Sequence, residues 1–142
     1  MSEERRVLSL LLTSPDTLAH VASAYKPEIL CESAFARTVC RWALDFWKTD
    51  PKVPAAMHMM DIYVQRSEEV ADETENGAIR EYLQNLSRDW QKEEPASTDY
   101  AKELADKYFG RRARCKALER MQGAFEAGDM ESFDRAVEAY NK

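Results

Sequence analysis

The sequence lacks the residue patterns on which most nucleotide, metal and catalytic sites depend. Its 142 residues include only four glycines and two histidines, and they contain neither G-x-x-x-x-G-K-[ST] nor G-x-G-x-x-G. Backbone N–H groups can approach a phosphate closely only where such glycines leave room. His20 and His58 lack cysteine or carboxylate partners at metal-ligand spacing on their own helices. We therefore expect no catalytic residue, cofactor or metal, and no enzymatic activity of this chain itself.

Cysteines and long apolar runs are also scarce. The three cysteines, Cys31, Cys40 and Cys115, are odd in number and scattered, which does not fit a disulfide framework and suits a reducing compartment. No stretch approaches the roughly 20 apolar residues that cross a membrane. The net charge of −6 argues against a surface that follows a phosphate backbone. The sequence thus predicts a cytoplasmic protein with no membrane contact and only weak or indirect contact with nucleic acid.

Apolar residues at helical spacing are what the sequence does contain. Between residues 54 and 67, Met57, Met60 and Val64 recur at three- and four-residue steps and are expected to face the core. Nothing alternates apolar and polar residues for long enough to make a strand. We expect an all-α fold, with helices over about residues 2–12, 15–25, 32–48, 54–67, 76–92, 99–127 and 130–140.

The last two of these helices differ from the rest in length and in the turn between them. No proline interrupts residues 99–127, whose roughly 40 Å at 1.5 Å per residue exceeds what a small bundle can bury end to end. Gly128 is a suitable C-cap and Asp129 a suitable N-cap, so the chain should turn back there. The sequence predicts a globular helical bundle head at residues 1–95, followed by a long antiparallel helical hairpin at residues 96–142.

An apolar seam along this hairpin is the candidate interface. Its members recur at helical spacing on both helices, and a hairpin that stands apart from the head has little in its own chain to cover them. We expect the seam to mediate self-association. Its seven residues are Tyr108, Leu118, Met121, Phe125, Phe133, Val137 and Tyr140.

Basic residues are concentrated on the same long helix. They are either the solvated flanks of a helix or a contact for an acidic protein surface or nucleic acid, and the absence of stacking aromatics between them favours protein. Residues 51–96 hold five basic residues against ten acidic ones, so the acidic middle of the chain could pair with the basic helix of another subunit. The six residues of this basic patch are Lys107, Arg111, Arg112, Arg114, Lys116 and Arg120.

Two further patterns have simpler explanations than catalysis. His58 and Asp61 share a helix face, where an acid–base pair could act, but pairs at this spacing are common on helix surfaces. Cys31 and Cys40 could meet in the fold, yet the sequence around them offers few groups that would lower a thiol pKa. We expect a surface pair and inert thiols.

Several segments, in chain order, resemble those of DnaB-type replicative helicases. Residues 4–15 (ERRVLSLLLTSP) resemble the opening of that family, where a short apolar helix leads through a Pro or Asp turn into a second. Residues 25–30 (YKPEIL) look like the family's L-x-P-E-x-F connection, and residues 34–46 (AFARTVCRWALDF) are similar to the helix after it. Residues 99–112 (DYAKELADKYFGRR) look like the first arm of the family's helical hairpin.

This resemblance implies a role in DNA replication. In the family, the corresponding domain is a non-catalytic collar at the N-terminal end of the helicase ring. It consists of a helical head and a hairpin that pairs between subunits, and it receives primase or a helicase loader. The ATPase motor lies in a separate C-terminal domain. The resemblance therefore predicts the N-terminal domain of a divergent, phage- or plasmid-type helicase that forms a dimer alone or a hexamer in the full-length protein.

Two other functions fit the same sequence. The helicase-binding C-terminal domain of a primase resembles the same fold and would also lack catalytic motifs. A free-standing small regulator that imitates this domain is the second alternative. An enzyme acting through His58 and Asp61 is the weakest hypothesis, because nothing else in the sequence supports it.

Overall fold

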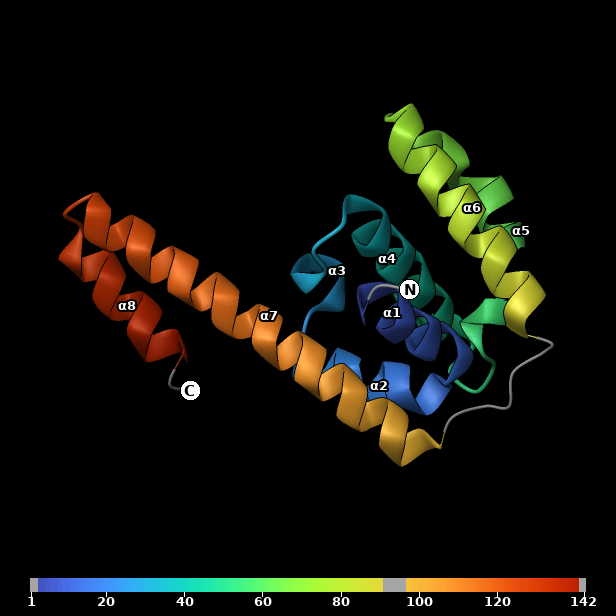
Figure 1. The fold of residues 1–142 in the computed structure, drawn as a ribbon, viewed down its shortest axis with the longest axis horizontal. Helices are drawn as coiled ribbons and strands as arrows, with labels where there is room; N and C mark the ends of the chain where they lie inside the picture. The colour runs from blue at the N-terminus through green and yellow to red at the C-terminus, as the bar shows by residue number, and fades with distance from the viewer. Residues whose placement is uncertain (1–2, 91–96, 141–142) are drawn as a thin grey trace.

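The computed structural model of the chain describes residues 3–90 and 97–140 (Figure 1). Every regular element in these two ranges is a helix, which confirms the all-α prediction. No helix in them is long and apolar enough to span a membrane. The expected start of the first helix at residue 2, the expected end of the fifth at residue 92 and the predicted boundary between residues 95 and 96 lie outside the described residues.

The helices follow the expected order, with three short additions. A single turn, α3, follows the Lys26–Pro27 break, and two 3-10 turns, η1 and η2, flank the short helix α5. The elements are α1 (Glu3–Thr13), α2 (Pro15–Ala24), α3 (Pro27–Leu30), α4 (Ala34–Thr49), η1 (Ala55–Met57), α5 (Met59–Arg66), η2 (Ser67–Glu69), α6 (Glu73–Trp90), α7 (Thr98–Glu126) and α8 (Met130–Tyr140).

The core of the head is built around α1 and α4. Leu8 and Leu12 on α1 and Val39 and Trp42 on α4 are each no more than 1 % exposed. Burying a side chain of this size stabilises the fold by about 1.5–3 kcal/mol, so a few such residues decide whether the head folds. Local signals place the helices around this core. Ser14, for example, accepts the backbone N–H of Thr17 at 3.2 Å and so caps α2.

The first half of α7 belongs to the head. Ala101, Ala105, Tyr108 and Phe109 are buried there against α1, α2 and α3. The second half of α7 leaves the head and is accompanied only by α8, which turns back alongside it (Figure 1). The boundary between head and hairpin therefore lies within α7, shortly after Phe109, and not between residues 95 and 96 as predicted. The prediction that a small bundle does not bury this helix end to end is confirmed.

The predicted inward face of residues 54–67 is wrong for Met57 and Val64, whereas Met60 is partly buried against the core. Met57 is 60 % exposed and Val64 is 72 % exposed, whereas Met59 is buried. The reason is the 3-10 turn at Ala55–Met57, which ends at His58 before α5 begins at Met59. A 3-10 turn advances by three residues per turn rather than 3.6, so a spacing counted through it gives the wrong helix face.

Candidate interaction surface on the helical hairpin

A buried hydrogen-bond network holds the middle of α7 to the head. The Tyr108 hydroxyl donates a hydrogen bond of 2.5 Å to Glu4 Oε2 on α1. The same oxygen accepts the backbone N–H groups of Glu32, at 2.6 Å, and Ser33, at 3.2 Å. These N–H groups lie at the start of α4, where the side chain of the N-cap residue Ser33 makes no capping bond. One carboxylate therefore joins α1, α4 and α7.

Burial and hydrogen bonding have opposite effects on the Glu4 carboxyl. Burial acts to raise its pKa, but the hydrogen bonds from Ser33, Tyr108 and Glu32 together bring the pKa below its usual value. For Tyr108, burial and the bond to the carboxylate both raise the pKa of the phenol. Glu4 is thus held as a charged acceptor and Tyr108 as a neutral donor.

Aromatic packing and a backbone contact fix the direction in which α7 leaves the head. The Phe109 ring stacks on Tyr25, with the two ring centroids 5.8 Å apart. One turn farther along, Arg112 Nε donates a hydrogen bond of 2.9 Å to the carbonyl oxygen of Leu30 at the end of α3. The hairpin therefore projects from a firmly held base.

Tyr108 is not part of the hairpin surface, which corrects its assignment to the interface. Its side chain is buried in the head, where it contacts Glu4 and packs edge-on against Phe109 with ring centroids 5.0 Å apart. The sequence pattern placed Tyr108 in the interface because one continuous helix runs through both the head and the hairpin. The first half of the seam covers the head, and only the second half faces the space between α7 and α8.

The turn between α7 and α8 has the predicted chemistry. Gly128 has a φ of 72°, in the left-handed region that a residue with a Cβ rarely adopts. Asp129 then accepts the Ser132 backbone N–H at 3.0 Å and the Ser132 hydroxyl at 2.6 Å, so it caps α8. Those hydrogen bonds to Ser132 lower the pKa of Asp129. Gly128 and Asp129 thus reverse the chain and start α8.

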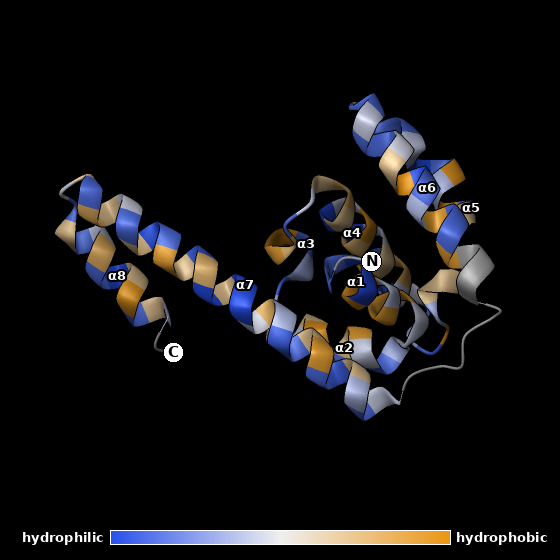
Figure 2. Cartoon of the chain, viewed as in Figure 1, coloured by the Kyte–Doolittle hydropathy of each residue, from blue (hydrophilic) through white to orange (hydrophobic). Residues whose placement is uncertain are grey.

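The other six predicted seam residues all lie on the hairpin. Leu118 and Phe125 are each 63 % exposed, Tyr140 is exposed, and Met121, Phe133 and Val137 are half-buried between the arms. Phe125 and Phe133 meet across the arms with ring centroids 6.1 Å apart. Figure 2 shows hydrophobic residues on both arms, interspersed with hydrophilic ones.

A groove of about 360 Å³ runs between the two arms. Its floor is apolar, and two arginines stand at the edge closer to the head. We call it the hairpin groove. The residues that line it are Arg111, Arg114, Cys115, Ala117, Leu118, Met121, Val137 and Tyr140.

Sequence reasoning missed some members of this surface. Cys115 and Ala117 line the groove, and Met130 at the start of α8 is exposed. Met130 was recognisable, because it precedes Phe133 by three residues and Val137 by seven, the spacing of one helix face. Ala117 carries no such signal, since a small side chain lines a groove only when the larger residues around it leave it uncovered.

Half of the basic patch is engaged within the chain. Lys107 pairs with Glu103 at 3.4 Å, Arg111 pairs with Glu3 on α1, and Arg112 makes the backbone contact described above. The first two pairs are well exposed, so each contributes at most about 1 kcal/mol. Arg111 and Arg112 thus link α7 to the head, whereas the Lys107 pair lies within α7.

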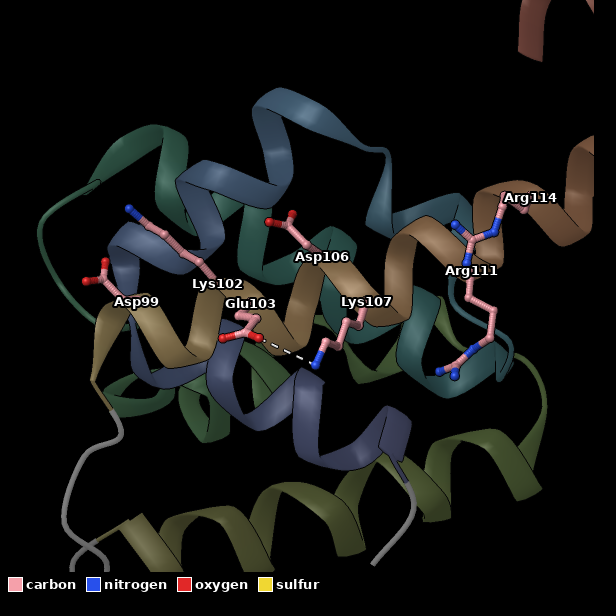
Figure 3. A pocket seen from close by; sticks show the side chains of 7 residues that line it. All are labelled: Asp99, Lys102, Glu103, Asp106, Lys107, Arg111 and Arg114. Atoms are coloured by element: carbon pink, nitrogen blue, oxygen red, sulfur yellow. Dashed lines mark ion pairs between the residues drawn. The ribbon is translucent and has the colours of Figure 1, made fainter. Parts of the chain in front are cut away.

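The other half of the patch lies farther along α7, on the hairpin. Arg114 and Arg120 are exposed and Lys116 is half-buried. Figure 3 shows Arg114 close to Arg111, at the end of a row of charged side chains that begins at Asp99. Acidic and basic groups are mixed along this row, which makes it a poor match for a phosphate backbone. Arg111 and Arg114 both also line the hairpin groove, so they give one end of it positive charge.

The two arms of the hairpin have opposite net charge. Residues 111–126 of α7 contain five basic and two acidic residues, whereas residues 127–140 contain one basic and four acidic residues. Among residues 97–140, no ion pair joins the arms. Arg111 and Arg112 are engaged with the head, but other charges of both arms are exposed and available to a partner of complementary charge. They are Arg114 and Arg120 on α7 and Glu131, Asp134 and Glu138 on α8.

The weaker sequence candidates lie away from the hairpin. The half-buried His58 packs its ring on Phe46, with centroids 5.2 Å apart, while Asp61 is exposed. Cys31 and Cys40 do meet, with their sulfur atoms 3.6 Å apart, and both are buried. The hydrogen bond with Cys31 and burial both raise the pKa of Cys40, so this thiol is a poor nucleophile. No group of metal-ligating side chains is found in the described part of the chain.

The chain has no significant match to any known protein-family model, curated protein or solved structure. The likeness to DnaB-type helicases rests on the sequence segments quoted above, and the function that it implies stays a prediction. The main candidate surface is the hairpin groove together with three exposed apolar side chains of the same two helices. We call these three, Leu118, Phe125 and Tyr140, the apolar rim.

Proposed function

We propose that this chain is a non-catalytic interaction domain that self-associates through its hairpin and serves a replicative DNA helicase. In this role, its copies form the collar at the N-terminal end of the helicase ring and dock primase or a helicase loader. ATP hydrolysis then belongs to another domain of the parent protein. The proposal combines the sequence resemblance with the surface chemistry of the hairpin.

One observation carries the self-association part of the proposal. Among the described residues, half of the exposed large hydrophobic side chains lie on residues 111–140, a small part of the chain. They surround the hairpin groove or lie beyond it on the same two helices. A concentration of exposed apolar side chains in one region is typical of protein interfaces. The four residues are Leu118, Phe125, Met130 and Tyr140.

The free energy expected from burying these side chains fits a contact between proteins. Full burial of a large apolar side chain contributes about 1.5–3 kcal/mol, so Leu118, Phe125 and Tyr140 would add on the order of 3–6 kcal/mol after allowance for the part already covered. Association itself costs about 4–15 kcal/mol in lost freedom of motion. The apolar rim therefore supplies a substantial share of the binding free energy, and the charged arms supply orientation.

Light scattering over a concentration series tests the role of the hairpin. We expect the wild-type chain to associate and Leu118→Asp to raise the dissociation constant at least tenfold, because it places a charge in the apolar rim. Gly123→Asp is the matched control, since it adds the same charge to α7 at a site where a Cβ meets nothing within 4 Å. A wild-type chain that stays monomeric at high concentration would contradict the proposal.

The helicase part of the proposal needs a separate test. The reading frame of the native gene should continue after Lys142 into a domain with a G-x-x-x-x-G-K-[ST] motif, and purified primase or loader should bind the chain. A stop codon after Lys142 would instead support the free-standing regulator. A zinc ribbon and a polymerase core upstream would support the primase domain.

A further inference from the structure

A second uncovered apolar face lies on the head, along η1 and α5. Met57 and Val64, seven residues apart, are 60 % and 72 % exposed, and Met60 lies half-buried between them. Met60 and Val64, four residues apart in α5, share one side of that helix, and Met57 lies just before it in η1. We call these three residues the α5 stripe. Two exposed large apolar side chains beside a half-buried third make the stripe a candidate contact surface.

Acidic side chains flank the α5 stripe. Asp61, on the turn between Met60 and Val64, is exposed, and so is Glu68 in η2. The nearby Glu69 accepts hydrogen bonds from Arg66, which also pairs with Asp45 at 2.7 Å, so this arginine is already engaged. The stripe is therefore the apolar side of a short helix with negative charge along its edge. A groove with an apolar floor and a positive rim is its natural complement.

The hairpin groove has those two properties, but it cannot receive the stripe of its own copy. Figure 1 shows α5 on the side of the head opposite to the hairpin, and α7 holds the two apart. A second copy of the chain carries both the groove and the stripe. It is present at the same concentration as the first copy.

We infer that the α5 stripe of one copy seats in the hairpin groove of the next, in a head-to-tail contact. Met57 and Val64 then cover the apolar floor around Leu118, while Asp61 and Glu68 face Arg114 and the neighbouring Arg111, whose pair with Glu3 is exposed. This inference rests on the proposed function, because it names what the self-associating hairpin binds.

The competing occupant of the groove is the hairpin of a second copy, in a symmetric pairing that the opposite charges of the two arms also permit. That pairing covers the groove but leaves Met57 and Val64 in water. The head-to-tail contact covers both apolar faces with one type of interface. Because each copy then uses two different surfaces, the contact propagates and produces rings or open chains instead of closed dimers.

A complementation experiment tests the inference. Leu118→Asp disables the groove, because it sets an acid against the acids beside the stripe. Val64→Lys disables the stripe, because it sets a cation against Arg111 and Arg114. Gln65→Lys is the matched control, since it adds the same charge at the next exposed position of α5. Circular dichroism should show unchanged helix content for all three, because the residues are exposed.

We expect each disabled variant alone to sediment as a monomer, with at least a tenfold weaker association than the wild type or Gln65→Lys. An equimolar mixture of Leu118→Asp and Val64→Lys should give a dimer and nothing larger, because one intact stripe meets one intact groove. Wild-type association by Val64→Lys alone, or a mixture that stays monomeric, would overturn the inference. Wild-type association by Leu118→Asp would overturn the proposed function as well.

Discussion

The head and the hairpin are stabilised in different ways, although α7 runs through both. In the head, large side chains from four or more helices are buried together, among them Leu12, Trp42 and Phe109, which are fully covered. In residues 111–140 the one buried side chain is that of Ala136. The head therefore has a core of its own, while the hairpin keeps its shape through helix continuity and a capped turn. The difference shows that the apolar residues of the hairpin contribute less to a buried core than those of the head, which fits the proposed binding role.

The sharpest test of this comparison uses two phenylalanines of α7. Phe109→Ala should lower the free energy of unfolding by about 3–5 kcal/mol, because it leaves a cavity beside Tyr25 and Tyr108. Phe125→Ala should change it by about 0.5 kcal/mol or less, because this ring is mostly in solvent. Urea unfolding of both variants in the Leu118→Asp background removes the effect of association. Equal losses from the two substitutions would mean that the hairpin has a core of its own.

A smaller effect is expected at the joint between the regions. Glu4→Gln keeps the shape of the side chain but removes the charge that accepts three hydrogen bonds, so it should cost about 1–3 kcal/mol at pH 7. The fold lowers the pKa of Glu4 from its usual value of 4.5, so its contribution is complete above about pH 4.5 and is lost as the pH falls through the lowered pKa. The stability gap between wild type and Glu4→Gln should therefore narrow in acid.

Glu3→Gln is the control for this measurement. Glu3 is the neighbouring carboxylate, but its pair with Arg111 is exposed, so the substitution should cost at most about 1 kcal/mol. Urea unfolding at pH 7 and at several lower pH values compares the three proteins. A stability gap for Glu4→Gln that stays constant into acid would show that the charge of Glu4 does not matter.

The smallest expected effects concern two glycines of the hairpin, and they differ in sign. Gly128→Ala should destabilise the hairpin by about 1–2 kcal/mol, because it forces a Cβ into the left-handed region at a φ of 72°. Gly123→Ala should stabilise it by up to about 1 kcal/mol, because this glycine is exposed inside a helix. Hydrogen exchange of the α8 amides should speed up in the first variant and slow down in the second. A change in hairpin stability of the same sign in both variants would contradict this account of the turn.

The helices and the turn could be predicted from the sequence because their signals are local. The proline and glycine positions, the caps and the three- and four-residue spacings place most helix ends within a few residues of the observed ones. The Gly128–Asp129 reversal was predicted for the reason that the structure shows, a left-handed glycine followed by a capping carboxylate.

The errors came from non-local packing and from interrupted helices. The partner of Tyr108 is Glu4, 104 residues away, and no spacing in the sequence indicates that pair. Met57 and Val64 were assigned to the core because the 3-10 turn between Pro54 and His58 has no clear signature in the sequence. The groove lies on the two helices that the sequence indicated. Its boundary with the head and the proposed counterpart on α5 could be found only in the structure.

Because α7 is continuous, the number of residues between the head and the hairpin groove fixes the angle between the groove and the head. From Phe109, which fixes the helix to the head, to Cys115, which lines the groove, no break or kink absorbs a change. At 3.6 residues per turn, one added residue in that stretch would rotate the groove by about 100° and move it outward by about 1.5 Å. The number of residues in this part of α7 thus determines the direction that the groove faces, and with it the path along which successive copies can be joined.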